Sequence, residues 1–346
     1  MDLQNKKILI TGASGRVARQ VIYELNKIGI KPIAHLRESS NSAYIDSLKL
    51  EKRYADLRNR AQVVELVKSI DYIIHTVAII NFRQDRSTQI TGLNTVAALE
   101  LFQAAQAAGV KRFVHVSSTV AVGAVPRTFE TDHLKGDVNL ANEDQEFNLG
   151  SLRIPYILTK HAAEVELGKL ANGSGTELVI VNPSIIIAPS RNKDDRESAM
   201  KRLPRFVVPD IRNRVNLVDL RDVARGIIAA LERGKSGERY ILGGDNITVR
   251  ELALAVSAEI GKTPHLFKYP AWIYRMAAKV SVIFSRLGGR SKISFYPDLV
   301  KLLDYDWAFS SMKARNELGY TYRSIYISLS DLLNNEFNDT YMRPIG

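Results

Sequence analysis

Two side chains that can exchange a proton stand four residues apart, Tyr156 and Lys160 in the stretch Tyr-Ile-Leu-Thr-Lys. At this spacing on a helix, both side chains lie on the same face. A tyrosine hydroxyl has a pKa near 10, so at neutral pH it is a poor acid or base. An ammonium group within a few ångströms can lower that pKa by roughly 1–3 units. The pair therefore predicts a tyrosine acid/base that a lysine supports.

Hydroxyl side chains follow an apolar stretch upstream, where Val114-His115-Val116 runs into Ser117-Ser118-Thr119. A hydroxyl at the end of a strand can hold a substrate oxygen while Tyr156 gives or takes the proton. Taken singly, each pattern is common in proteins without such chemistry. Their order on one chain, behind the glycine turn described next, is what indicates a catalytic site.

A glycine turn lies near the N-terminus, where Ile8-Leu9-Ile10 leads into Thr11-Gly12-Ala13-Ser14-Gly15-Arg16-Val17-Ala18 and then into a helical pattern. The G-x-x-G-x-x-A spacing suits a strand that turns sharply into a helix and lets the backbone approach a diphosphate. The helix N-terminus adds free N–H groups and the positive end of its dipole. The turn predicts a dinucleotide site, with an ordinary strand–turn–helix as the alternative.

The residue after the second expected strand indicates which dinucleotide binds. An NAD site usually carries Asp or Glu about 20 residues past the glycines, to bind the ribose 2′-hydroxyl. Here Arg37 stands 25 residues after Gly12, beside Glu38. A guanidinium suits a 2′-phosphate, and Arg16 adds a second cation. We therefore expect NADP(H) rather than NAD(H), the alternative being that Arg37 is a solvated strand-end residue.

Composition narrows the classes of protein and of site. The chain has 346 residues, of which 45% are hydrophobic, so it can bury a full core. It has no cysteine, which excludes disulfides, thiolate zinc sites, iron–sulfur clusters and a cysteine nucleophile. The six histidines are dispersed, and we expect no metal site. With no signal peptide or membrane span visible, the expected location is cytoplasmic.

Strand and helix patterns alternate through the first half of the chain. Expected strands cover 8–10, 33–36, 53–57, 72–77, 112–116 and 178–182, and expected helices cover 16–28, 61–68, 94–108 and 154–170. Near-continuous apolar strands separated by helices imply a parallel sheet covered on both faces. The predicted fold is α/β, a Rossmann-type doubly wound sheet, followed by a mainly helical C-terminal third.

Together these motifs resemble the extended short-chain dehydrogenase/reductases, the NAD-dependent epimerase/dehydratase group, over about residues 6–332. The matching segments are 11–15, 109–118, 155–160 with Glu164, 181–184, 216–219 with 222–224, and 313–320. Within the group the chain is most similar to the dihydroflavonol-reductase and 3β-hydroxysteroid-dehydrogenase branch, which also has an arginine at the position of Arg37. The resemblance implies a dinucleotide-binding core over 1–183 and a smaller substrate lobe over 184–346, from which segments at about 215–245 return to the core.

The resemblance also implies the site residues. Ser118, Tyr156 and Lys160 form the catalytic trio, with Ser117 as the second choice for the serine. Gln89 stands where the family often has a supporting asparagine. Asp56 could receive the adenine amino group, and Asn182 would lie near the nicotinamide. We assign to the cofactor site Gly12, Ser14, Gly15, Arg16, Val17, Arg37, Asp56, Leu57, Val77, Ala78, Tyr156, Lys160, Pro183 and Ser184.

The predicted function is an NADP(H)-dependent oxidoreductase that moves a hydride between nicotinamide and a carbonyl or secondary alcohol. Its substrate would be small and apolar, similar to a steroid, an isoprenoid or a flavonoid. One alternative is an NAD-dependent sugar-nucleotide epimerase with the same trio. Another is a non-catalytic protein that senses NADPH. The run Ser118-Thr119-Val120 lacks the acid pair of sugar 4,6-dehydratases, which disfavours that reaction.

Net charge is +11, and residues 260–297 hold seven basic side chains and no acid. On a helix over 271–287, apolar side chains would span roughly 120° beside Arg275, Lys279 and Arg286. Such a face predicts peripheral membrane contact through 271–290, with packing on the small lobe as the plainer alternative. No nucleic-acid-binding motif is present, so the expected partners are a small-molecule substrate and, as alternatives still open, a membrane surface or a second copy of the chain.

Overall fold

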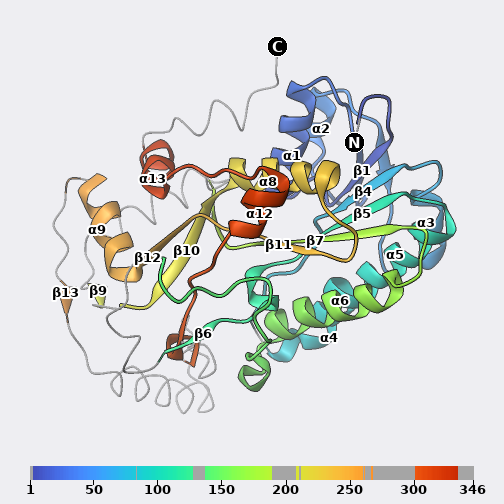
Figure 1. Ribbon diagram of the computed structural model, residues 1–346. Coiled ribbons are helices and arrows are strands. Elements are labelled where there is room, and N and C mark those ends of the chain that lie inside the picture. Colours follow the sequence, from blue (N-terminus) through green and yellow to red (C-terminus); the bar gives the residue numbers. More distant parts are fainter. Residues whose placement is uncertain are drawn as a thin grey trace, which may run out of the picture.

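A central sheet of seven parallel strands organises the fold, in the order β11-β7-β5-β4-β1-β2-β3 (Figure 1). This computed structural model describes residues 3–82, 84–127, 137–188, 208–209, 212–259, 261, 266–267 and 301–333. The strands are β1 (Ile8–Thr11), β2 (Ile33–Leu36), β3 (Lys52–Tyr54), β4 (Tyr72–His75), β5 (Arg112–Val116), β7 (Glu177–Pro183) and β11 (Arg239–Leu242). The order reverses between β1 and β4, which is where doubly wound sheets bind ligands. The predicted fold class is confirmed.

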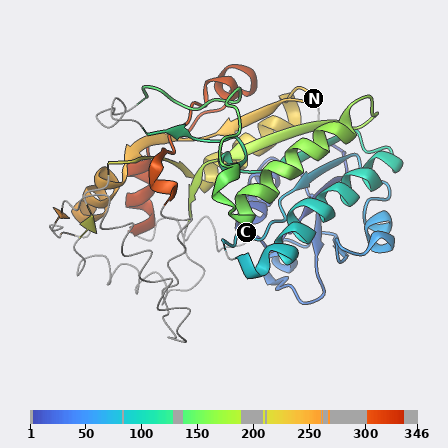
Figure 2. The same cartoon turned by 90° about the horizontal axis from the view of Figure 1, so that it is seen from below.

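Helices cover both faces of this sheet. On one face lie α1 (Arg16–Lys27), α8 (Leu220–Arg233) and α12 (Met312–Leu318). On the other face, seen from below in Figure 2, lie α3 (Arg60–Leu66), α5 (Ala97–Ala107) and α6 (Pro155–Ala171).

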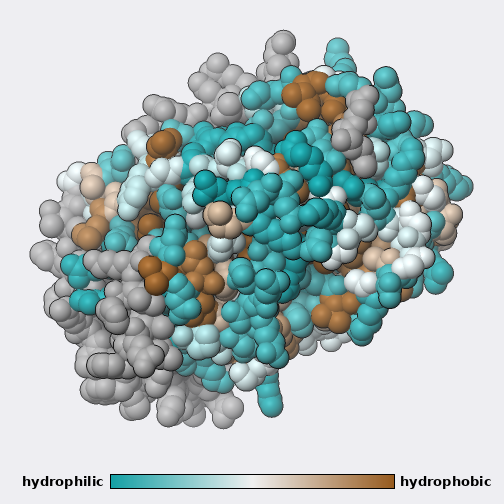
Figure 3. All heavy atoms as spheres, viewed as in Figure 1, coloured by the Kyte–Doolittle hydropathy of each residue, from teal (hydrophilic) through white to brown (hydrophobic). Residues whose placement is uncertain are grey.

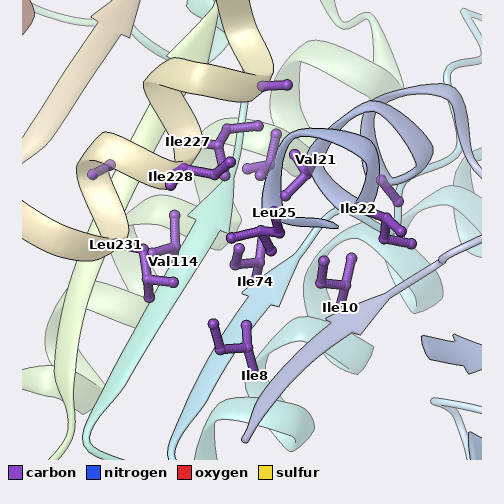
Figure 4. Close-up of a cluster of buried hydrophobic side chains, with 14 of the residues drawn as sticks. Ile8, Ile10, Val21, Ile22, Leu25, Ile74, Val114, Ile227, Ile228 and Leu231 are labelled. Atoms are coloured by element: carbon purple, nitrogen blue, oxygen red, sulfur yellow. The ribbon is translucent and has the colours of Figure 1, made fainter. Parts of the chain in front are cut away.

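Strand side chains alternate between these two layers. Ile8, Ile10 and Ile74 pack under α1 and α8, as Figure 4 shows, whereas Leu9 and Ile73 face the opposite layer. Because both faces are buried, the strands are apolar almost without interruption.

Shorter elements complete the chain. They are α2 (Ala43–Ser47), η1 (Gln84–Arg86), α4 (Ser87–Thr91), the π-helical turn η2 (Gly92–Val96), η3 (Thr119–Ala121), β6 (Val125–Pro126), η4 (Gly150–Leu152), β8 (Ile185–Ile187), β9 (Val208–Pro209), β10 (Arg214–Asp219), β12 (Asp245–Thr248), α9 (Val249–Glu259), β13 (Leu266–Phe267), η6 (Lys301–Asp304), β14 (Tyr305–Asp306) and α13 (Ile325–Leu333). Strands β12, β10 and β8 form a second sheet beside the first. The sequence did not predict this sheet, because its strands are short and polar residues interrupt them.

The last described segment returns across the carboxyl edge of the main sheet. β14 pairs with β6, and the Trp307 N–H donates to the Arg214 carbonyl at 2.9 Å. Asp306 accepts from the Arg214 backbone N–H at 2.9 Å and from Nε at 3.1 Å. Both side chains are buried, so the ion pair fixes the segment that carries Trp307.

The surface seen in Figure 3 is mostly hydrophilic, with apolar side chains in several separate patches. Within the described ranges no helix has the length and apolar character needed to cross a membrane. The predicted interfacial segment 271–290 lies outside the described residues.

Replacing Asp306 with Asn tests the ion pair. The substitution leaves the buried Arg214 guanidinium without its counter-charge, which should lower the free energy of unfolding by about 3–5 kcal/mol. Urea unfolding followed by circular dichroism measures the loss, and Asp144→Asn at an exposed position is the control. A loss below about 1 kcal/mol would show that the pair does not hold the segment.

Candidate active site

A pocket of about 590 Å³ opens at the carboxyl ends of the central strands. Its lining includes many of the predicted residues: Gly15, Arg16, Val17, Ala78, Ser117, Ser118, Tyr156, Lys160, Pro183 and Ser184. The other assigned residues, Gly12, Ser14, Arg37, Asp56, Leu57 and Val77, are not part of that lining. The structure thus brings the predicted catalytic trio and the start of α1 into one cavity.

The glycine turn closes tightly against β4 and β2. Gly12 has φ +69°, and a Cβ there would lie 2.8 Å from Val77 Cγ2. The Gly12 N–H donates to His35 Nδ1 at 3.2 Å, and His35 Nε2 lies 3.0 Å from the Ala55 carbonyl. The imidazole is therefore the neutral Nε2–H tautomer, consistent with a pKa that burial lowers.

The start of α1 fits a dinucleotide diphosphate. Gly15 precedes the helix, and within the described part of the chain no side chain caps it. The first turn of α1 also contains no acidic residue, so its N–H groups and dipole favour an anion. Arg16 is exposed at this end and lines the pocket, which adds a cation for a phosphate.

The adenosine end of the expected cofactor site is more exposed. Arg37 is exposed after β2, and Asp56 follows β3. The Asp56 carboxylate accepts from Arg58 Nε at 2.9 Å and from Nη2 at 2.6 Å. These bonds lower the pKa of Asp56 to about 2, and Arg37 acts in the same direction. Asp56 thus already pairs with Arg58, which the sequence did not suggest.

Tyr156 is the second residue of α6, after Pro155 at the first helical position. Its side chain is 8% exposed, and the ring of Phe82 meets it edge-on with centroids 5.8 Å apart. Burial raises the pKa of Tyr156, while a hydrogen bond with Ser118 acts in the opposite direction. The net shift is therefore opposite to the lowering expected from a neighbouring lysine, because the cost of burying a phenolate dominates.

Lys160 lies one turn further along α6 and is 1% exposed. Its Nζ donates to the Val116 carbonyl at 2.8 Å, at the end of β5. Burial lowers the pKa of Lys160 to about 8, whereas Glu164 raises it. The ammonium is thus bound to the backbone at the end of the strand that leads into Ser118.

Ser118 follows β5 in an extended conformation, with φ −165° and ψ 155°. Asn182 Nδ2 donates to its carbonyl at 3.0 Å. Because its hydroxyl meets Tyr156, the geometry favours Ser118 over Ser117, which is buried.

Sequence reasoning missed Asn94, which supports the site from the π-helical turn. Its Oδ1 accepts from the Ile79 N–H at 2.7 Å, and its Nδ2 donates to the Ile79 carbonyl at 3.0 Å and to Thr159 Oγ1 at 3.3 Å. Asn94 thus ties the loop after β4 to α6, whereas Gln89 is exposed on α4. The expected helix over 94–108 begins at this residue, where an asparagine is an ordinary helix cap, so no local signal marked its role.

Apolar side chains form the other end of the pocket, and the sequence did not point to them. They are Ile80, Phe82, Val120, Ile157, Leu302, Trp307 and Phe309. Trp307 Nε1 donates to the Leu302 carbonyl at 3.1 Å, so the polar atom of the indole is satisfied within the protein. These residues come from segments far apart along the chain, which no local pattern links.

Comparison with known proteins identifies the family. Residues 8–243 match the NAD dependent epimerase/dehydratase family. The chain belongs to this family. The family resemblance predicted from the motifs is thereby confirmed, and with it an NAD(P)-dependent oxidoreductase of the extended short-chain type whose cofactor is a nicotinamide dinucleotide.

Two relatives match this chain over nearly the whole length of both proteins. Sterol demethylase protein B of Methylococcus capsulatus is 28% identical over 332 residues, covering 93% of this chain and 96% of that protein. A protein of Synechocystis sp. provisionally named dihydroflavonol 4-reductase is 28% identical over 340 residues, covering 96% of this chain and 95% of that protein. The crystal structure of gox2253 superposes with a TM-score of 0.80 at 27% identity, covering 98% of this chain and 100% of that one.

The burial of Lys160 in this family member has a consequence for stability. With a pKa of about 8 when folded against about 10.4 when unfolded, the protonated lysine destabilises the fold at neutral pH. The free energy of unfolding should rise with pH between these two pKa values, because the unfolded chain binds more protons there than the folded one. Relative to Lys160→Met, the wild type should gain roughly 2–3 kcal/mol between pH 7.5 and 10. Urea unfolding at both pH values measures this, and a pH-independent difference would contradict it.

Proposed function

We propose that the protein is an NADP(H)-dependent oxidoreductase that moves a hydride between nicotinamide and a carbonyl or secondary alcohol of a small, apolar substrate. The observation that carries this proposal is that a single pocket is lined by Ser118, Tyr156 and Lys160, by the start of α1 with Arg16, and by a set of apolar side chains. A carbonyl bound beside the trio would meet the tyrosine and the serine together.

The chemistry of the lining supports an apolar substrate. Within the described residues, Arg16 and Lys160 are the cations that line the pocket. Arg16 stands beside the expected diphosphate of the cofactor, and Lys160 is buried against Val116. The names of the two relatives, which refer to a sterol and a dihydroflavonol, agree with a ring-containing apolar substrate.

Each side chain has a defined task in this proposal. Bound NADPH supplies the hydride. Ser118 donates a hydrogen bond to the substrate oxygen and orients it, while the Tyr156 hydroxyl gives that oxygen its proton. The Lys160 ammonium stabilises the tyrosinate that forms and can bind the cofactor ribose. Phe82 and Trp307 exclude water from the reacting atoms.

Replacing Tyr156 with Phe removes the acid and leaves the ring in place. Carbonyl reduction should fall by roughly 10²–10⁴-fold, the usual contribution of a general acid. Binding of NADPH, measured by fluorescence titration, should stay unchanged, and Tyr326→Phe on the surface is the control.

The assay uses a panel of steroid, isoprenoid and flavonoid ketones together with nucleotide sugars. Full activity in the Tyr156→Phe variant would refute the mechanism. Turnover of a nucleotide sugar with tightly retained NAD and no net change in cofactor would instead indicate an epimerase.

Cofactor preference depends on Arg37. Its exposed guanidinium directly after β2 is available to a 2′-phosphate, whereas NAD sites usually place an acid there; here the nearest acid along the chain is the exposed Glu38, one residue further on. The neighbouring acid Asp56 is already paired with Arg58. We therefore infer that NADP(H) binds more tightly than NAD(H).

The Arg37→Asp variant tests this preference. One lost charge-assisted hydrogen bond should change the ratio of the NADPH and NADH dissociation constants by roughly ten- to hundredfold in favour of NADH. Lys31→Asp, at the other end of the same strand, controls for net charge. An unchanged ratio would remove Arg37 from the cofactor site.

A further inference from the structure

A buried carboxylate lies behind the catalytic trio and has no task in the proposed mechanism. Glu164 follows Lys160 by one helical turn on α6 and is 7% exposed. Its Oε1 accepts from Asn182 Nδ2 at 2.6 Å, and its Oε2 lies 3.5 Å from Arg239 Nη1. Burial raises the pKa of Glu164, whereas Ser117, Arg239 and Asn182 lower it, so the charged form depends on these partners.

The partners of Glu164 are themselves fixed. Arg239 on β11 donates from Nε to the Glu143 carbonyl at 2.8 Å and from Nη2 to the Gln145 carbonyl at 3.3 Å. Asn182 on β7 uses one amide nitrogen for both Glu164 and the Ser118 carbonyl. The carboxylate is therefore held from two strands, and the same contacts reach the catalytic serine.

Lys160 has few other charges around it. The groups that act on it are Glu164 on its own helix, His75 on β4 and His115 on β5. Burial lowers the pKa of His75 to about 3 and the pKa of His115 well below its usual value, so both imidazoles are neutral at neutral pH. Among the described groups that act on Lys160, Glu164 thus supplies the negative charge.

We propose that Glu164 is a positioning residue whose carboxylate, fixed by Asn182 and Arg239, is the counter-charge that keeps the buried Lys160 ammonium protonated. Glu164 contacts neither the substrate nor the cofactor in this scheme, and it affects proton transfer from Tyr156 through Lys160. The catalytic consequence rests on the proposed function, whereas the coupling between the two charges does not.

Titration of Lys160 in the Glu164→Gln variant tests the coupling directly. Lysines labelled with ¹³C at Cε are followed by NMR in the full-length protein without substrate, and the Lys160→Met variant identifies the signal. The midpoint, about 8 in the wild type, should fall by roughly 1–3 units, because an opposite charge nearby is lost. Glu166→Gln, on the same helix and paired at the surface with Lys169, should leave it unchanged.

A second variant covers the case in which Glu164→Gln does not fold. In Glu164→Asp the carboxylate is kept but withdrawn by one methylene, so the Lys160 midpoint should fall by a smaller amount. A midpoint that stays at its wild-type value in the folded variant, whether Gln or Asp, overturns the proposal.

Activity provides a separate readout. In Glu164→Gln the alkaline limb of the pH profile of kcat should move to lower pH by the same interval as the NMR midpoint, and it should not move in Glu166→Gln. An alkaline limb that stays in place while the midpoint falls would overturn the catalytic part. If no ketone in the panel is reduced, the proposed function fails. The NMR titration would still show whether the charge of Glu164 raises the pKa of Lys160.

Discussion

Keeping a buried ammonium charged is the constraint on which the rest of the site depends. Lys160 has 1% of its surface exposed, and removing a charge from water costs several kcal/mol unless other groups repay it. The Val116 carbonyl offers one acceptor, and Glu164 offers the opposite charge. Glu164 in turn needs β7 and β11 beside it. One charge thus requires α6 and the three neighbouring strands β5, β7 and β11 in a single arrangement, to one side of the point where the sheet order reverses.

The two ends of the pocket are built in different ways. The cofactor end is local, since the glycine turn and the start of α1 follow one another in the chain. The substrate end closes only when the segment after residue 300 returns, held by Asp306 on Arg214. Because Trp307 and Phe309 enter from so far along the chain, the shape of this end can change without disturbing the cofactor end.

Much of the first half of the fold could be predicted from the sequence. The strand over 112–116 was predicted with its observed bounds, because its apolar run is continuous and buried on both faces. The glycine turn and the Tyr156–Lys160 spacing are local patterns, and both lie at the pocket.

The contacts that could not be predicted join distant segments. Asn216 interrupts the apolar pattern of β10, and its amide bonds to the Gly244 carbonyl and to Asn246. The direction of the Tyr156 pKa depends on burial, which spacing does not reveal.

The opposite shifts of Tyr156 and Lys160 bear on the protonation state of the site. Burial raises the pKa of Tyr156 and lowers that of Lys160, so it favours the neutral form of each group over a tyrosinate–ammonium pair. The hydrogen bond from Ser118 lowers the pKa of Tyr156, and the charge of Glu164 raises the pKa of Lys160, so both oppose the effect of burial. Carbonyl reduction starts from a protonated tyrosine, whereas alcohol oxidation starts from the tyrosinate. Burial therefore favours a protonated Tyr156, while the charge of Glu164 opposes the loss of the Lys160 proton.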